Sequence, residues 1–130
     1  MTCGQARVSM QCERQSSGGC VQTGLMWQSG NEPPKRIQPP AELGADRFAG
    51  ALACVQGRDG KSMVAVQYTA FPRDCKFCEF LFMYDASGRL LTRSQPLILG
   101  TGAEQRPNLE QFDQVLKSAG SPKLSWTYLR

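Results

Sequence analysis

Six cysteines in a chain of 130 residues limit the fold more than any other feature of the sequence. An even number of cysteines in a short chain is typical of a disulfide framework, and such frameworks form in oxidising compartments outside the cytosol. We therefore predict a disulfide-stabilised protein that is periplasmic or secreted. The cysteines expected to form disulfides are Cys3, Cys12, Cys20, Cys54, Cys75 and Cys78.

The pairing of these cysteines stays open at the level of sequence. The three N-terminal cysteines are expected to tie their region together or to attach it to the sheet. Cys75 and Cys78 could close a local bridge, or one of them could pair with Cys54.

The segment from Cys75 to Cys78 has the CxxC spacing of thioredoxin-type redox pairs. In those proteins the motif opens a helix, whose N-terminus stabilises a thiolate. Here residues 79–84 are mostly aromatic and apolar, which predicts a strand. The pattern therefore favours a structural disulfide over a redox centre.

Metal binding is disfavoured by the cysteine spacing. A structural zinc site usually joins two closely spaced cysteine pairs, and the sequence contains a single CxxC. Cys3, Cys12 and Cys20 are too widely spaced to supply a second pair. We expect no metal and no other cofactor.

The chain contains no histidine. Histidine is the commonest general acid or base, so Ser-His-Asp and Cys-His nucleophile systems cannot be assembled. The 11 acidic residues are scattered through polar segments, where solvated surface charge explains them. We therefore predict that the protein is not an enzyme.

The start of the chain, residues 1–5, has neither the basic nor the apolar region of a secretory signal. An exported protein would therefore be present here in its mature form, with Met1 as an added start residue. The longest apolar run, residues 80–84, is far shorter than the roughly 20 residues that a membrane-spanning helix needs. We expect no membrane span.

The N-terminal half predicts one hairpin and one long loop. Polar and apolar residues alternate over residues 7–12, and a turn cluster at 15–19 leads to a return strand over 20–27. A proline-rich loop follows at about 29–46, because its two Pro-Pro pairs resist both helix and central strand.

Two further hairpins are predicted in the middle of the chain. The first joins residues 48–56 to 62–69 through a turn with Asp-Gly, and the second joins 77–84 to 89–94. Residues 80–84 are apolar on both faces, which indicates a central strand covered on both sides.

One C-terminal helix is predicted over about 108–119. Asn108 is a suitable N-cap, Gln111 stands at the position of a capping box, and Gly120 can end the helix. A last strand follows over 123–129. The predicted fold is α+β, a mostly antiparallel sheet built from hairpins with this helix packed on one face, in a single domain over 1–130.

The charge pattern favours a protein partner over nucleic acid. The net charge is +4, but the 15 basic residues are spread along the whole chain, whereas nucleic-acid-binding proteins concentrate them on one face. A modest positive charge also fits an acidic protein surface.

The candidate contact residues lie in and before the proline-rich loop. They are Trp27, Lys35, Arg36 and Ile37. Large apolar and arginine side chains on a stiff loop lose little entropy on docking and are frequent binding hot spots. The alternative is that Trp27 packs beneath the loop and Ile37 attaches it to the sheet.

These observations predict a non-enzymatic exported binding protein, a monomer or weak dimer. Its most concrete form is an inhibitor or immunity protein that blocks a toxic or lytic enzyme in the bacterial periplasm. One alternative is a thiol-disulfide oxidoreductase that uses Cys75 and Cys78. Another is a structural component of the cell envelope.

Overall fold

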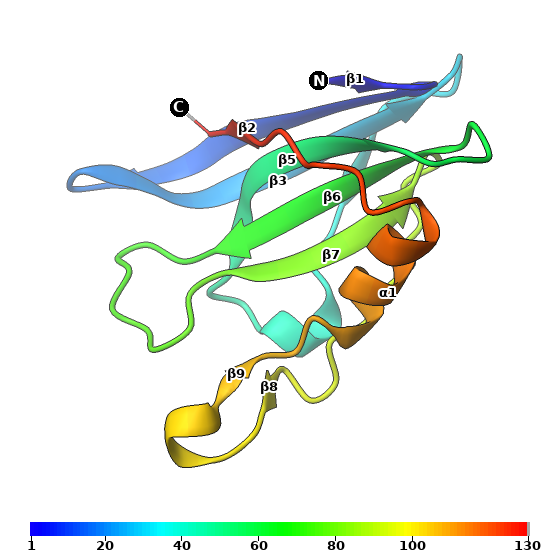
Figure 1. The fold of residues 1–130 in the computed structure, drawn as a ribbon. Helices are drawn as coiled ribbons and strands as arrows, with labels where there is room; N and C mark the ends of the chain where they lie inside the picture. Colours follow the sequence, from blue (N-terminus) through cyan, green and yellow to red (C-terminus); the bar gives the residue numbers. More distant parts are fainter. Residues whose placement is uncertain (130) are drawn as a thin grey trace.

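The computed structural model describes residues 1–129 and contains two four-stranded antiparallel sheets that face each other (Figure 1). We call the first sheet A. Its strands lie in the order β1-β2-β3-β4, and β2 and β3 form a long hairpin. The bounds are Thr2–Cys3 for β1, Ala6–Ser16 for β2, Gly19–Ser29 for β3 and Lys35–Ile37 for β4.

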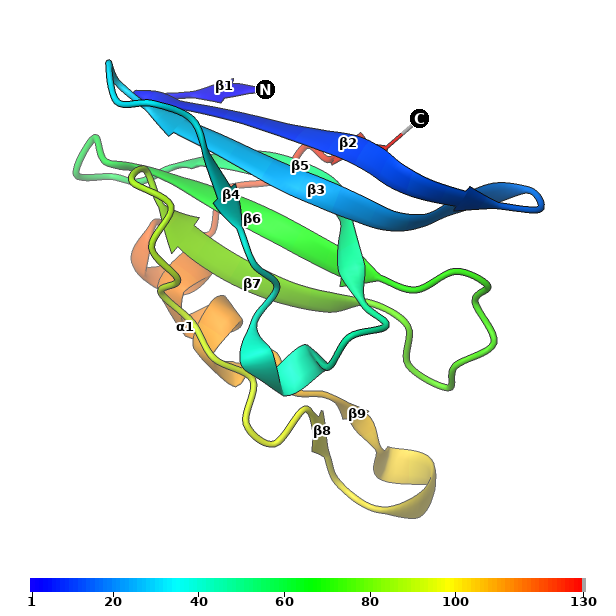
Figure 2. The same ribbon diagram turned by 180° about the vertical axis from the view of Figure 1, so that it is seen from behind.

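Sheet B has the order β10-β5-β6-β7, and the helix α1, Glu110–Ser118, covers its outer face (Figure 2). A small ribbon of β8 and β9 extends beside the helix. The remaining bounds are Phe48–Gln56 for β5, Ser62–Thr69 for β6, Phe80–Asp85 for β7, Ile98–Leu99 for β8, Arg106–Pro107 for β9 and Thr127–Tyr128 for β10. The predicted α+β fold with mostly antiparallel sheets and one late helix is confirmed.

Sheet B has a hydrophobic core on each of its faces. The core between the two sheets includes fully buried Trp27, Val66 and Phe82. The core beneath α1 is built around Met83 and Phe112. Alternate residues of β7 therefore face different cores, which explains why this strand is apolar on both sides.

The position of β7 differs from the prediction, because it lies at the edge of sheet B. Residues 89–94 form no regular strand beside it and make only an isolated bridge, between Tyr84 and Leu90. The Leu91 N–H donates to the Met83 carbonyl at 2.8 Å, and the Met83 N–H donates to Thr92 Oγ1 at 3.0 Å. These bonds cover the edge that a central strand would have paired.

The start of α1 also differs from the predicted capping box. The helix begins at Glu110, and Asn108 stands one residue too early to be its N-cap. Asn108 Oδ1 still accepts the Glu110 N–H at 3.1 Å. The Gln111 side chain instead accepts the N–H of Arg93 at 2.6 Å, so a tertiary contact replaces the local one.

Two further segments are shorter or more ordered than predicted. The last strand covers only residues 127–128, which pair with the outer edge of β5. The stretch 29–46 is not a continuous loop, since it contains β4 and a short 3₁₀ helix at Ala41–Leu43. Its prolines flank β4, and an edge strand tolerates such neighbours where a central strand does not.

Three disulfides use all six cysteines. Cys3–Cys54 joins sheet A to sheet B, while Cys12–Cys20 and Cys75–Cys78 each close a short segment. Of the alternatives left open for the CxxC pair, the local bridge is therefore formed. In residues 1–129 the longest helix is far too short and polar to cross a membrane.

Candidate functional site

The two local disulfides lie at the same end of the sandwich, which we call the disulfide end (Figure 1, left). It consists of the tip of the β2–β3 hairpin, residues 13–19, and the loop 70–79 that follows β6. The two segments touch: a Cβ atom on Gly19 would lie 3.0 Å from the ring of Phe71. The disulfide-bonded hairpin of sheet A thus meets the loop of sheet B that contains the second local disulfide.

A cleft of about 690 Å³ lies beside these loops. Its lining comes from both sheets and from the stretch between β4 and β5. Apolar side chains of Leu25, Ile37, Phe48 and Phe71 share the lining with the guanidinium-bearing residues Arg14, Arg36 and Arg47.

Two of the candidate contact residues line this cleft, and a third lies beside them. Arg36 and Ile37 belong to β4 and contribute to the lining, whereas Lys35 precedes them on the same edge strand. Lys35 and Arg36 are exposed. Ile37 is half-buried and packs against the core between the sheets, so it also attaches the segment to the sheet.

Trp27 lies in the hydrophobic core, so its side chain cannot contact a partner. Its side chain is 0 % exposed, and its Nε1–H donates to the Ala86 carbonyl at 3.0 Å. Its ring is 5.5 Å from that of Tyr84. The alternation of β3 turns this residue into the core, where it supports the turn at the opposite end of the sandwich.

Arg36 forms an ion pair with Glu13 of β2 that crosses over β3. The crossing is possible because β3 carries Gly24 there, where a Cβ atom would lie 2.6 Å from Glu13 Oε2. The hydrogen bond from Arg36 lowers the pKa of Glu13 and raises the pKa of Arg36. This exposed pair fixes the edge strand that borders the cleft.

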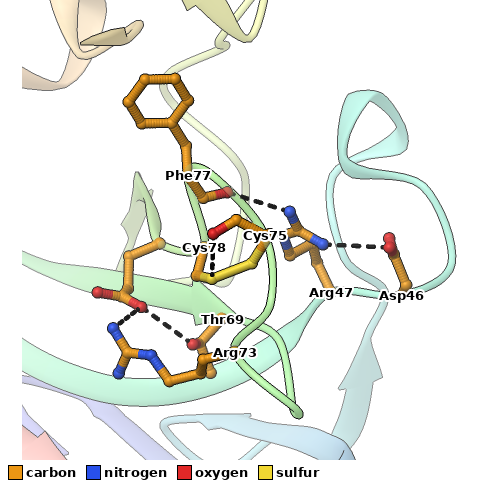
Figure 3. The surroundings of a disulfide bond; sticks show 8 residues. Asp46, Arg47, Thr69, Arg73, Cys75, Phe77 and Cys78 are labelled. Atoms are coloured by element: carbon orange, nitrogen blue, oxygen red, sulfur yellow. Dashed lines mark hydrogen bonds and ion pairs between the residues drawn. A yellow bond between two sulfur atoms is a disulfide. The ribbon is translucent and has the colours of Figure 1, made fainter.

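Arg47 is a site residue that sequence reasoning missed (Figure 3). Its Nη2 donates to the Phe77 carbonyl at 3.1 Å, and its Nη1 lies 3.2 Å from Asp46 Oδ2. Its guanidinium carbon lies 5.9 Å from the centre of the Phe80 ring, and the side chain is only 14 % exposed. The side chain is therefore already immobilised.

Arg14 was also missed. It is exposed at the base of the hairpin tip, and no carboxylate within residues 1–129 forms an ion pair with it. Nothing in the local pattern distinguishes Arg14 or Arg47 from ordinary surface charge. Only the packing of distant segments brings them to one cleft.

Charged side chains hold the loop that contains the Cys75–Cys78 disulfide (Figure 3). Arg73 Nη2 lies 2.5 Å from Glu79 Oε2, which also accepts the Thr69 hydroxyl at 3.3 Å. The strand β7 begins at Phe80, so no helix follows the CxxC segment. The loop is thus fixed by side chains and by its disulfide.

Two buried tyrosines lie behind the cleft. The hydroxyl groups of Tyr68, which reaches the cleft lining, and Tyr84 share a hydrogen bond of 2.6 Å. Burial raises the pKa of Tyr84 to about 12 and also raises the pKa of Tyr68. Both hydroxyls therefore stay protonated near neutral pH, and their mutual hydrogen bond satisfies two polar groups inside the core.

The described residues thus define a disulfide-bonded, helix-covered β-sandwich with a basic cleft at one end. No protein-family model matches the sequence, and comparison with curated proteins and with solved structures gives no match either. Within residues 1–129, no group of three or more His, Cys, Asp or Glu side chains is arranged to hold a metal ion.

Proposed function

We propose that this is an exported, non-enzymatic binding protein, periplasmic or secreted, that acts as an inhibitor or immunity protein against a toxic or lytic enzyme. One observation carries the proposal: a basic cleft is lined by Arg14 of the hairpin that Cys12–Cys20 closes and by Phe71 of the loop that also contains Cys75–Cys78. Two residues expected from the sequence to contact a partner, Arg36 and Ile37, line that cleft.

The physical argument concerns the entropy of binding. Docking requires loops and side chains to be immobilised, and each flexible side chain costs about 0.5–1.5 kcal/mol of affinity. The disulfide end is restrained before binding by two covalent closures, and Arg47 is held by the Phe77 carbonyl and the Phe80 ring. An inhibitor that must occupy an enzyme's active site benefits from such rigidity.

The alternative of a thiol-disulfide oxidoreductase has one observation in its favour. A small cleft of about 410 Å³ borders Cys75 and Cys78, and another of about 290 Å³ borders Cys75. Against it, a strand follows the CxxC segment, so no helix N-terminus is present to stabilise a thiolate. Measuring the reduction potential separates the two functions, since structural disulfides resist the glutathione pool.

The proposal is tested by binding and by inhibition. The first candidate partner is the product of the neighbouring reading frame, because inhibitors and their targets are often encoded together. We expect a stoichiometric complex in size-exclusion chromatography with light scattering, and loss of the partner's enzymatic activity. Immobilised protein would also be used to capture partners from native extracts.

A matched pair of variants makes this experiment specific. R14E/R36E reverses two charges at the cleft, and K61E/K117E makes the same net change at exposed residues outside it. We expect the first variant to lose the complex and the second to keep it. Absence of any specific protein partner, or equal binding by both variants, would contradict the proposal.

A further inference from the structure

We infer that the cleft at the disulfide end receives an acidic loop of the partner protein, with a carboxylate side chain among the arginines and an apolar neighbour on the cleft floor. This inference rests on the proposed function, since it names the chemistry of the partner that the cleft would bind. It concerns the same surface but makes separate predictions.

The charge of the cleft lining supports a carboxylate. Its ionisable residues other than tyrosine are three arginines, Arg14, Arg36 and Arg47, and a single acid, Asp46. Asp46 already pairs with Arg47 and Glu13 with Arg36, so Arg14 is the arginine of the lining that has no ion pair within residues 1–129. Arginine pairs with carboxylates through two parallel hydrogen bonds, which gives direction as well as attraction.

The position of Arg47 is restrained in advance. Its side chain lies over the Phe80 ring and donates to the Phe77 carbonyl in the disulfide-closed loop. An arginine that is already held loses little further rotamer entropy when it binds an anion. The loop therefore contributes to binding even where it does not touch the ligand.

The apolar part of the lining supports a neighbouring hydrophobic side chain. Leu25, Ile37, Phe48 and Phe71 contribute to the cleft, whose volume of about 690 Å³ is within the range of sites that enclose several side chains. A small inorganic anion would leave this apolar surface unused. A loop with adjacent acidic and aromatic residues uses both parts of the lining.

Two other ways of binding fit less well. Strand addition at β4 is discouraged by the Pro33-Pro34 and Pro39-Pro40 pairs on either side and by charged Lys35. Single-stranded nucleic acid stacks its bases on exposed aromatic rings. Within residues 1–129 the large exposed hydrophobic side chains are Leu91 and Tyr128, and neither lines the cleft.

Glu13 is an internal competitor in this arrangement. It already occupies Arg36, and both side chains are partly exposed. A carboxylate from the partner must share or replace Glu13. Removal of the Glu13 charge is therefore expected to strengthen binding of an acidic ligand, whereas a purely structural role of the pair would make the same change weaken it.

The test uses a synthetic cyclic peptide that carries Asp-Phe-Glu, titrated into the isotope-labelled full chain and followed by NMR. We expect amide shifts concentrated at residues 21–25 and 36–49, with binding that weakens as salt is added. The control peptides carry Asn-Phe-Gln and Lys-Phe-Lys in the same ring. They are expected to bind at least tenfold more weakly.

Variants of the protein complete the test. R14E should raise the Kd for the acidic peptide at least tenfold, R14Q less, and E13Q should lower it two- to fivefold. K61E, a charge reversal at the opposite end, should change it less than twofold. Arg14 is exposed, and an unchanged amide spectrum elsewhere would confirm that its variants fold.

Several outcomes would overturn the inference. They are shifts outside the cleft, equal binding of the neutral peptide, stronger binding of a single-stranded oligonucleotide, and weaker binding by E13Q. The proposed function fails separately, when the wild-type chain binds no protein partner. If a partner is captured while the acidic peptide does not bind at the cleft, only the present inference is wrong.

Discussion

The two ends of the sandwich are closed by different means. At the disulfide end, Cys12–Cys20 links the paired strands β2 and β3 close to their turn, and Cys75–Cys78 closes part of the irregular loop 70–79. The opposite end, which we call the turn end, consists of the short turns 57–61 and 85–88 (Figure 1, right). The two turns contain no cysteine and are fixed by carboxylates: Asp59 Oδ1 accepts the Lys61 N–H at 3.0 Å, and Asp85 Oδ1 accepts the backbone N–H groups of Ser87 and Arg89, each at 2.9 Å.

The difference follows from how the backbone polar groups at each end find hydrogen-bond partners. A short turn satisfies its own backbone groups and needs only one side chain to fix it. The loop 70–79 forms no regular strand and gains order from Cys75–Cys78, whereas Cys12–Cys20 bridges β2 and β3 where bulges interrupt their pairing. The end whose order depends on covalent bonds is also the end that borders the basic cleft.

The largest expected loss of stability at the turn end comes from removing the Trp27 side chain. Trp27→Ala deletes a fully buried side chain and its hydrogen bond to Ala86, and we expect a loss of about 3–5 kcal/mol in the free energy of unfolding. Urea denaturation measures it. A loss below about 1 kcal/mol would show that the side chain does not support this end. The Asp-Phe-Glu peptide should still bind the folded fraction.

The corresponding change at the disulfide end is removal of its bridges. We expect C12A/C20A to lower the free energy of unfolding by about 2–3 kcal/mol and C75A/C78A by about 2 kcal/mol, because the second bridge closes a shorter loop. Chemical denaturation measures both. Unlike Trp27→Ala, these variants should weaken binding at the cleft, and unchanged affinity would contradict the role assigned to the bridges.

Alkaline pH perturbs the core that both ends share. Because burial raises the folded-state pKa of Tyr84 to about 12, its contribution to stability is complete below pH 10 and is lost as the pH rises above that value. We expect a loss of about 1.4 kcal/mol at pH 11 from Tyr84 alone. Thermal unfolding at several pH values measures it, with Y84F as the control. Y84F should remove only the part that comes from Tyr84, because the pKa of Tyr68 is also raised; Y68F/Y84F should remove both parts, and an unchanged slope in that double variant would assign the dependence to other groups.

The smallest expected effect belongs to Asp85. Burial alone would raise its pKa, but hydrogen bonds from Ser87 and Arg89 outweigh burial and lower it. Asp85→Asn keeps the shape and weakens these bonds, so we expect a loss of about 1 kcal/mol. Hydrogen exchange at residues 85–91 should accelerate while exchange at residues 70–79 stays unchanged. Equal acceleration at both would mean that the two ends are not independent.

The parts of the structure that could be predicted are those whose signals are local in the sequence. The hairpin of β5 and β6 has the bounds expected from its Asp-Gly turn, since the signal is local. The helix was also predicted, because its apolar stripe and its end at Gly120 are encoded within a dozen residues.

The cleft and the strand that borders it could be predicted only in part. Lys35, Arg36 and Ile37 were expected from composition, but their pairing with β3 as an edge strand was not. Arg14, Arg47 and Phe71 reach the cleft through contacts between segments far apart in the chain. Trp27 was misplaced because an aromatic residue beside a proline-rich stretch resembles a surface anchor, while the alternation of β3 directs it inward.

The pairing of the cysteines also affects how the cell must oxidise this protein. Oxidation in order of appearance along the chain would join Cys3 to Cys12 and Cys20 to Cys54, and only the last pair would be native. Escape from such mispaired chains proceeds by thiol–disulfide exchange. We therefore expect an isomerase to speed maturation, and a host that lacks one to accumulate more mispaired protein.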